Sequence, residues 1–193
     1  MDDELGIGLS FTSDYSGEGH AMGTLVGLMR ADSGKTATMR NCFAKSCLAY
    51  YGSADGSYIG GLVGKTDGAV SINNSYFFGG LVKGEGDYKI GSIANADANA
   101  SINNSWALSV GGTAHLTHES LVSGTECEVN NCLVSDGDYF IKVGDNQTSV
   151  TITNVEQLFD VGFMNNAFGW EFGDWCGLEE SGVPPTLRVF YNF

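Results

Sequence analysis

The chain has 193 residues, of which 23 are acidic and 9 basic, and its formal net charge is −14. Nucleic acid and anionic membranes are poor partners for such a chain, because binding either of them requires a basic surface. Its length suits one domain or one elongated repeat body, and no apolar stretch is long enough to insert into a membrane. With 28 glycines and only 2 prolines, the sequence favours a fold with many tight corners.

The first element in chain order is a predicted strand over residues 5–11, where apolar residues alternate with glycine and serine. We expect residues 1–22 to form an N-terminal cap that covers the first repeat. The acidic start does not have the pattern of a signal peptide. Either the chain is cytoplasmic or it is a fragment expressed without its leader, and we expect the fragment.

A repeat begins at residue 23 and dominates the chain. Its clearest copy reads Gly60-Gly-Leu-Val-Gly64, then a polar loop, then Ala69-Val-Ser-Ile-Asn-Asn-Ser-Tyr-Phe-Phe78. Similar segments occupy residues 23–43, 91–106, 121–133 and 141–155. Self-similarity at such a period is typical of stacked supersecondary units. Each copy contains two short runs in which apolar residues alternate with polar or small ones, which predicts strands rather than helices.

We therefore predict one all-β domain, a parallel, right-handed β-helix of about five coils over residues 23–155, closed by a C-terminal aromatic cap over residues 156–193. The position of Cys42 recurs in the later copies, as Ser75, Ser105, Cys132 and Val155. Apolar residues at equivalent phases of the repeat should point into the interior of the coils. They are Leu25, Val63, Ile72, Ile93, Ile102 and Val129.

Paired asparagines recur at one phase of the repeat and predict a shared corner. Asparagine tolerates the left-handed backbone conformation that a sharp corner demands, and its amide both donates and accepts hydrogen bonds. Asn74, Asn104 and Asn131 should then form a ladder at the spacing of adjacent strands, about 4.8 Å. The alternative is that the pairs merely mark ordinary turns.

The five cysteines stand at positions 42, 47, 127, 132 and 176 and contain no Cys-x-x-Cys pair. Neither a zinc knuckle nor a redox motif is indicated. Cys42 and Cys132 occupy the repeat position that Ser75 and Ser105 hold in other copies. We interpret them as small interior residues of a stack rather than as disulfide partners.

Patterns that suggest phosphate or metal binding are incomplete. Gly34-Lys-Thr and Gly64-Lys-Thr each lack the earlier glycine of a phosphate loop, and strand patterns follow them where a helix is needed. We interpret the two as echoes of one repeat loop. His115, His118 and Glu119 are predicted to lie in an external loop, because residues three apart on a strand point to opposite faces. The strict nonapeptide of calcium-binding β-rolls is missing. We expect neither a cofactor nor a metal.

The composition changes after the last repeat. Asn154 and Gln157 fit a capping box that opens a short helix. The segment beyond is rich in aromatic residues and glycine, and we expect it to plug the open end of the last coil. The alternative is a platform for sugar rings, which stack on flat aromatic faces. The candidate ligand-binding residues of this platform are Trp170, Phe172 and Trp175.

The Gly-Gly-Leu-Val-Gly segment followed by Ile-Asn-Asn-Ser-Tyr-Phe resembles the GLUG repeat of bacterial surface proteins, a group that includes adhesin-like proteins and segments of immunoglobulin A proteases. The resemblance spans residues 23–188 and is clearest over residues 60–76. Gly169-Trp-Glu-Phe, with the stretch from Gly182 to Arg188, also looks like the tail that closes many such arrays. The resemblance implies an extracellular or cell-surface protein, an adhesin or a spacer within a longer chain. It carries over no catalytic residue and identifies no ligand, although a surface glycan or protein would be the partner.

A polysaccharide-active enzyme, either a lyase or a glycoside hydrolase, is the alternative, because parallel β-helices also host such enzymes. Its site would need carboxylates clustered along one groove. The nearest set is Asp67, Asp87 and Asp97, near Lys65 and Lys89. We interpret these as solvated loop charges and expect a module without enzymatic activity.

Overall fold

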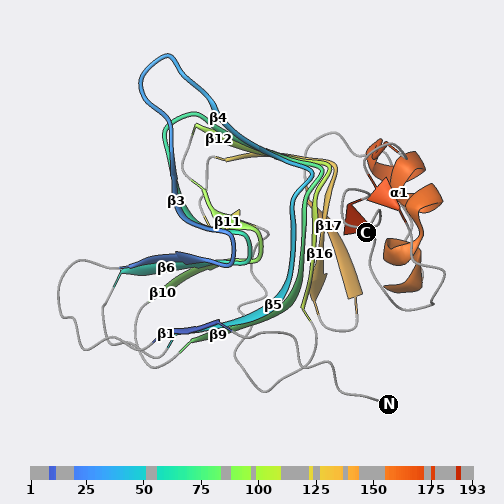
Figure 1. Cartoon of the computed structure of the whole chain (residues 1–193), viewed down its shortest axis with the longest axis horizontal. Coiled ribbons are helices and arrows are strands. Elements are labelled where there is room, and N and C mark those ends of the chain that lie inside the picture. Colours follow the sequence, from blue (N-terminus) through green and yellow to red (C-terminus); the bar gives the residue numbers. More distant parts are fainter. Residues whose placement is uncertain are drawn as a thin grey trace.

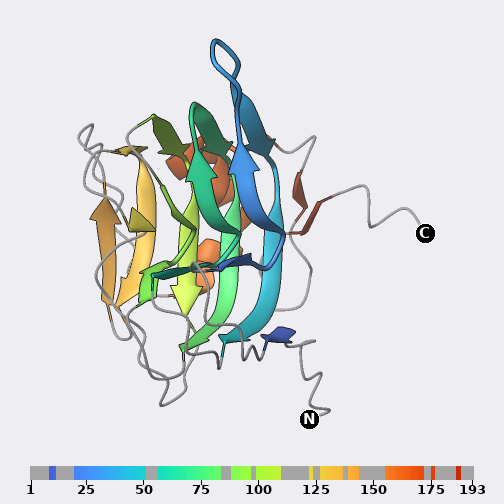
Figure 2. The same ribbon diagram turned by 90° about the vertical axis from the view of Figure 1, so that its left-hand side faces the viewer.

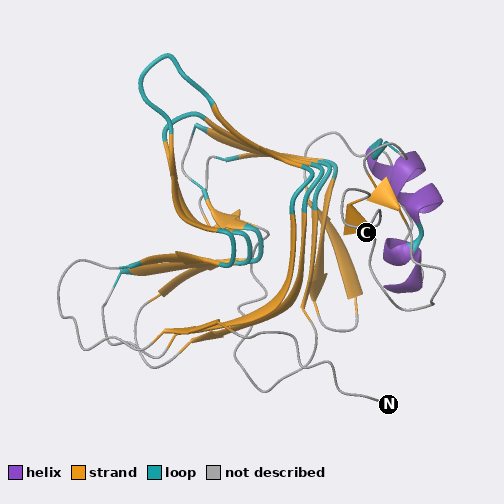
Figure 3. Ribbon diagram, viewed as in Figure 1, coloured by secondary structure: helices purple, strands orange, loops and turns teal. Residues whose placement is uncertain are grey.

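The computed structural model describes residues 9–11, 20–50, 56–83, 88–96, 99–109, 122–123, 127–136, 139–143, 155–171, 175–176 and 186–187. Within these residues the fold consists mostly of parallel strands in several sheets, accompanied by a single α-helix (Figures 1 and 3). The expectation of a strand-rich protein is confirmed at this level.

Four sheets form the body of the molecule. Sheet I has the order β10–β6–β2 (Tyr88–Gly91, Ser57–Gly60 and Ala21–Gly23). Sheet II has the order β14–β11–β7–β3 (Val122–Ser123, Ala94–Asn95, Val63–Asp67 and Val26–Arg30). Sheet III has the order β15–β12–β8–β4 (Glu128–Asn130, Ala100–Asn103, Val70–Asn73 and Ala37–Arg40). Sheet IV has the order β1–β5–β9–β13–β16–β17 (Leu9–Phe11, Phe43–Tyr50, Tyr76–Lys83, Trp106–Ser109, Cys132–Asp136 and Tyr139–Val143).

The chain visits sheets I to IV in turn and then begins again, so each sheet is built from successive copies of the repeat. We call residues 20–50 row 1, residues 56–83 row 2, residues 88–109 row 3 and residues 122–136 row 4. Neighbouring rows pair in parallel, and Ile72 of row 2 lies beside both Met39 and Ile102. Figure 2 shows the rows side by side, with row 1 toward the right. The sequence predicted two strands per copy, whereas rows 1 to 3 contain four each.

Sheets I and II meet at a sharp inward bend of the chain at residues 60–62 (Figure 1). A Cβ atom on Gly60 would lie 1.8 Å from the carbonyl oxygen of Val63, and one on Gly61 would lie 2.0 Å from that of Ser92. Both obstacles are backbone atoms, which cannot swing aside as a flexible side chain can. Glycine is therefore needed because two backbones approach closely, and the Gly-Gly-Leu-Val-Gly motif marks this bend.

The first hydrophobic core is formed by buried side chains of rows 1 to 4. Most residues predicted to point inward do so: four are fully buried, namely Val63, Ile72, Ile93 and Ile102, and Val129 packs against them. The repeat phase thus identifies the interior of the stack.

Leu25 is the exception, because its side chain is 46% exposed. Its backbone N–H donates to the carbonyl of Leu62, so it is the row 1 counterpart of that fully buried residue rather than of Val63, which pairs with Val26. Row 1 is the outer row of sheets I, II and III, and Leu25 therefore has a packed row on one side only. The prediction for Leu25 was wrong because burial depends on the place of the row as well as on the phase.

The corner between sheets III and IV is built on asparagine, as predicted. Four asparagines adopt the left-handed conformation there, with φ between 48° and 53°: Asn41, Asn74, Asn104 and Asn131. Nδ2 of Asn131 donates to Oδ1 of Asn104 at 2.9 Å. The preceding asparagines form a second ladder, in which Asn103 donates to Asn73 at 3.0 Å and Asn130 donates to Asn103 at 3.1 Å. The predicted corner is confirmed and Asn41 extends it to row 1, whereas the predicted ladder is confirmed for the bond between Asn131 and Asn104.

The parallel repeat ends at β17. This strand runs antiparallel to β16, with Ile141 opposite Val134. Ile141 therefore does not start a fifth parallel row, and Val155 lies at the start of a 3₁₀ helix rather than in the stack. Residues 150–154 of the expected fifth copy lie outside the described residues. The prediction of a fifth coil was wrong here because apolar alternation indicates a strand but not its direction.

The C-terminal segment contains the 3₁₀ helix η1 (Val155–Phe159) and helix α1 (Val161–Phe168), so the expected short helix is present. Asp160 is the N-cap of α1, and its side chain accepts hydrogen bonds from the backbone N–H groups of Gly162 and Phe163. The cap expected at Asn154 lies outside the described residues. Gly169 ends α1 in the left-handed conformation, with φ of 68°.

Helix α1 covers the outer face of sheet IV (Figures 1 and 3). The second core lies between them and contains Tyr76, Trp106, Leu108 and Leu133 from the sheet, and Leu158, Val161, Met164, Phe168 and Trp170 from the C-terminal segment. The expected plug over the end of the last coil is therefore not formed by residues 155–171, which cover a lateral face. A short antiparallel pair of strands, β18 (Trp175–Cys176) and β19 (Thr186–Leu187), completes the described segment.

Candidate binding surfaces

Trp170 is the one predicted sugar contact whose side chain the structure describes. It is fully buried, its Nε1 donates to the carbonyl oxygen of Asn104 at 2.8 Å, and its ring lies 6.2 Å from that of Tyr76. Trp175 lies in β18, where only the backbone is described, and Phe172 lies outside the described residues. A sugar could stack on Trp170 only if the C-terminal segment moved away from sheet IV. Its contacts support a packing role.

Trp170 adjoins a column of aromatic side chains that crosses the rows. The rings of Tyr76 and Trp106 stack at 4.3 Å, and Phe43 of row 1 stacks on Tyr76 at 5.2 Å. Burial raises the pKa of Tyr76 well above its ordinary value, because the phenolate would lose its hydration. Phe43 is only partly buried, and Nζ of Lys45 lies 5.7 Å from its ring centroid. Desolvation lowers the pKa of Lys45.

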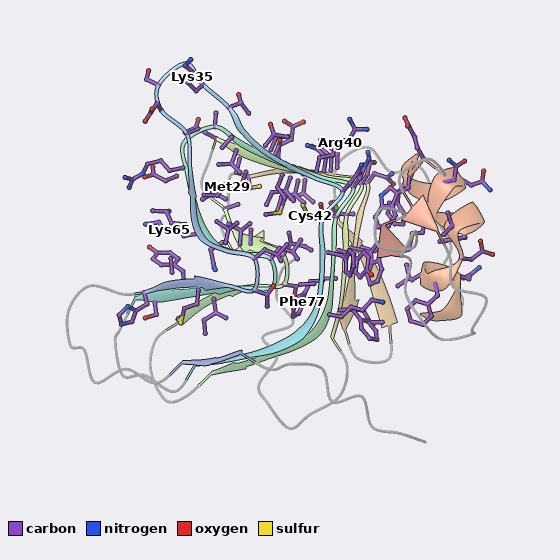
Figure 4. The ribbon with its side chains drawn as sticks, in the orientation of Figure 1. Met29, Lys35, Arg40, Cys42, Lys65 and Phe77 are labelled. Carbon is purple, nitrogen blue, oxygen red and sulfur yellow. The ribbon has the colours of Figure 1, made fainter. Side chains whose placement is uncertain are left out.

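Of the charged residues of the enzyme alternative, the structure describes the side chains of Lys65 and Asp67, which lie two residues apart on β7 and contact different partners. Nε of Arg30 lies 2.6 Å from Oδ2 of Asp67, and both side chains are well exposed. Lys65 is on the outside of β7 (Figure 4), with Nζ 4.5 Å from the ring centroid of Tyr58. Asp87 and Asp97 lie outside the described residues, and only the backbone of Lys89 is described, in β10. The described contacts are a solvated ion pair and a cation–π pair.

The two Gly-Lys-Thr segments are not structural equivalents. Lys65 lies within β7 and pairs with Leu28, whereas Lys35 lies in the exposed loop between β3 and β4 (Figure 4). Residues 31–36 form this loop in row 1, while only residues 68–69 separate β7 from β8 in row 2. The interpretation of both segments as one repeated loop was wrong, because the longer loop shifts the sequence spacing away from the structural spacing.

The most regular polar surface is the outer face of sheet III. Two columns of side chains cross it: Thr38, Ser71, Ser101 and Glu128 form one, and Arg40, Asn73, Asn103 and Asn130 form the other. Oγ of Ser101 donates to Oγ of Ser71 at 3.2 Å, and Nδ2 of Asn130 donates to Oε1 of Glu128 at 2.9 Å. Hydroxyl and amide groups therefore recur at the spacing of the strands. Such an array can hydrogen-bond a polar ligand through both donors and acceptors.

Cysteine and serine share one column, as predicted. Oγ of Ser75 and Ser105 donates to the carbonyl two residues earlier, at 2.8 Å in both cases. The thiols of Cys42 and Cys132 occupy the same place, with Sγ at 3.3 and 3.2 Å from the corresponding carbonyl oxygens. Cys42, Cys132 and Cys127 are free thiols. Burial raises the pKa of Cys132 to about 12 and also raises that of Cys42, because a thiolate would be desolvated.

Among the residues that the structure describes, no group of three or more His, Cys, Asp or Glu side chains could hold a metal ion. His115, His118 and Glu119 lie outside them. The described part of the chain also contains no helix that is long and apolar enough to cross a membrane.

Sequence reasoning missed the concentration of positive charge in row 1. The row carries four basic side chains, Arg30, Lys35, Arg40 and Lys45, against the single acid Asp32, a formal charge of +3 in a chain of −14. Figure 4 shows Lys35 and Arg40 toward opposite ends of β4. A charge count for each repeat copy would have revealed this imbalance, which the total for the chain conceals.

Comparisons of the chain with protein-family models, with curated proteins and with solved structures find no match. The functional conclusions below rest on the residues and the geometry of this chain.

Proposed function

We propose that this protein is a non-catalytic β-solenoid module of an extracellular or cell-surface protein, in which rows 1 to 4 are successive coils of one right-handed parallel β-helix. The observation that carries this proposal is the parallel pairing of row with row in sheets II, III and IV. The resemblance of residues 60–76 to the GLUG repeat of bacterial surface proteins points in the same direction. A rigid stack of this kind would serve as an adhesin or as a spacer within a longer chain.

The roles of the repeated motif residues support a scaffold rather than an enzyme. Glycines 60 and 61 permit the close approach of backbones, the paired asparagines build a corner, and Ser75 and its counterparts bind carbonyl groups within the stack. Hydrolysis of a glycosidic bond canonically uses two carboxyl groups held on either side of that bond. Asp67, the described candidate, is paired with Arg30.

The binding surface of the proposed module is the outer face of sheet III. Sheet faces between fixed strands can vary without disturbing the stack, because these side chains point away from the core. Ser71, Ser101 and Asn103 present neutral hydrogen-bonding groups there, which suit the hydroxyl groups of a glycan or the polar surface of a host or microbial protein. The negative charge of the whole chain disfavours uronate polymers as ligands.

A glycan panel tests the proposal. The purified chain is incubated with plant, host and microbial glycans, and both retention on the immobilised glycan and new reducing ends are measured. We expect retention without cleavage, weakened several-fold by Ser101→Val. Ser33→Ala, in the exposed loop of row 1, is the matched control and should bind like the unmodified chain.

Three outcomes separate the candidate functions. Cleavage that disappears in Asp67→Asn would overturn the proposal in favour of the polysaccharide-active enzyme. Retention that Ser101→Val leaves unchanged would place the ligand on a surface other than sheet III. A chain that neither retains nor cleaves any glycan favours a spacer or a protein-binding adhesin.

A further inference from the structure

Among the described residues, row 1 forms the terminal row of sheets I, II and III. Strands β2, β3 and β4 each stand at the end of their sheet in the strand order, and Figure 2 shows the blue and cyan strands of row 1 at the right of the stack. The other end of sheet IV is different, because β17 is added antiparallel to β16 there. Among the described strands, β14 and β15 also end sheets II and III on the row 4 side, but it is on the row 1 side that the adjoining sheet IV accepts a further parallel strand.

The backbone of β4 has hydrogen-bonding groups aimed at this edge. The N–H groups of Ala37 and Asn41 donate to the carbonyls of Ala69 and Asn73 in row 2. Successive residues of a strand direct their N–H and C=O groups to opposite sides, so those of Thr38 and Arg40 point away from row 2. An added strand would pair with these groups, as row 1 pairs with row 2.

Sheet IV already accepts a strand on this side. Strand β1 pairs in parallel with β5, with Leu9 beside Leu48 and Phe11 beside Tyr50. The edges of β3 and β4 continue the same side of row 1. Two leucines of this row are the exposed large apolar residues of the described chain: Leu25 at 46% and Leu28 at 45%. A further row would cover Leu25, as row 1 and row 3 cover its counterpart Leu62, and it would flank Leu28, which lies beside Lys65 on the outer face.

The positive charge of row 1 indicates which kind of segment would bind at its edge. Row 1 carries a formal charge of +3, and Arg40 is exposed at its edge. The ion pair between Arg30 and Asp67, at 2.6 Å, joins side chains at paired positions of adjacent rows. We propose that the β3–β4 edge binds an extended segment with acidic outward side chains, which adds to sheets II and III as a parallel strand. This proposal rests on the sheet edge and does not require the function proposed above.

A second copy of this chain fits the edge less well than an acidic segment. Two copies that met by their row 1 edges would each bring a charge of +3 to the contact. Stacking row 1 on row 4 of another copy is obstructed, because β17 occupies the place beside β16 that β5 would need. An acidic strand from another protein would be attracted by the charge of row 1, and β17 would not obstruct it.

Synthetic peptides with the sequence of residues 62–76 test the proposal, because this segment already pairs with β3 and β4 from the row 2 side. One peptide is unmodified, one carries Asn73→Asp and one carries Asn73→Lys, since position 73 lies beside Arg40. Titration of the full chain at low salt should rank the affinities Asp, Asn, Lys, with roughly fivefold to tenfold between the extremes for an exposed charge pair. Thr38→Pro should abolish binding, because proline has no N–H, and Arg40→Gln should remove the ranking.

Thermal unfolding of each variant verifies that it is folded, and Arg40→Gln keeps the test valid if Thr38→Pro is not. The proposal fails if no peptide binds the unmodified chain, or if the charge ranking survives Arg40→Gln. Binding that persists in folded Thr38→Pro would also overturn it. If that variant binds a sulfated polysaccharide as well as the unmodified chain does, row 1 is an anion-binding surface and not a strand acceptor. Concentration-dependent self-association that Thr38→Pro abolishes would assign the edge to a second copy.

Discussion

Row 1 and row 2 contain the same elements in the same order, yet they differ in burial. Leu62 in row 2 is fully buried, whereas its row 1 counterpart Leu25 is 46% exposed. Row 2 has a packed row on each side, and row 1 has one on a single side of sheets I to III. The comparison shows that, in a stack of rows, the contribution of a side chain to the free energy of unfolding depends mainly on its contacts with neighbouring rows. Its contacts within its own row matter less.

The largest effect should come from removing the segment that makes sheet IV two-sided. Deleting residues 156–193 would expose Tyr76, Trp106 and Leu133, which are buried beneath α1. An apolar face of this kind promotes association, so we expect precipitation or soluble aggregates by light scattering. A truncated chain that stayed monomeric, with an unchanged thermal midpoint, would show that rows 2 to 4 do not depend on this cover.

The leucine pair tests the comparison directly. Leu62→Ala should cost about 2–5 kcal/mol of unfolding free energy, because it leaves a cavity between packed rows. Leu25→Ala should cost below about 1 kcal/mol, since much of that side chain already contacts solvent. Denaturant unfolding of both variants measures the difference. Equal losses would mean that Leu25 is covered in solution.

The asparagine corner separates backbone strain from the amide ladder. Asn104 has φ of 50° and accepts from Nδ2 of Asn131. Asn104→Ala should cost about 1–3 kcal/mol, because alanine resists the left-handed conformation and the ladder bond is lost. Asn104→Gly keeps the backbone freedom and should lose only the hydrogen-bond part, about 0.5–1.5 kcal/mol. Chemical denaturation that gives the same loss for both variants would rule out a strain contribution.

The sequence predicted the corner and most of the inner core because both are set by features that recur at every copy. The repeat position of Asn74 requires a positive φ in every row, and the repeat position of Ile72 faces the interior in every row. The exposure of Leu25, the direction of β17 and the place of α1 are set where the repetition stops. No periodic signal specifies them. The ends of a repeat array therefore need the three-dimensional contacts of individual residues.

The candidate surfaces also divide into features that the repeat predicts and features that it does not. The polar columns of sheet III could have been read from Ser71 and Asn73, because they alternate with buried residues along the strand. The basic character of row 1 was hidden in the net charge of −14, although Arg30 and Arg40 were visible in the sequence. Trp170 was expected in a segment that plugs the open end of the last coil, and its ring instead packs against that of Tyr76 in sheet IV. Composition alone does not distinguish a lateral cover from a plug.

The smallest effect concerns the cysteine column, where the contrast between rows should appear in chemistry more than in stability. Cys132→Ser and Cys42→Ser should each cost below about 1.5 kcal/mol, since Ser75 and Ser105 already make the same contact with a carbonyl. Cys132 is fully buried and Cys42 partly exposed, so an alkylating reagent should modify Cys42 first under native conditions. Mass spectrometry of the Cys132→Ser and Cys42→Ser variants resolves the two rates.

The raised pKa of Cys132 also gives a pH dependence. Its thiol titrates at about 12 in the folded protein, against 9.0 without burial. Between these values the folded state holds a proton that the unfolded state has released, so stability falls as pH rises. Below pH 9 both states are protonated and this group contributes no slope. Unfolding measured from pH 8 to pH 11 should therefore show a smaller decline in Cys132→Ser than in the unmodified chain. Equal declines would mean that Cys132 ionises readily in the folded state and is not enclosed by rows 3 and 4.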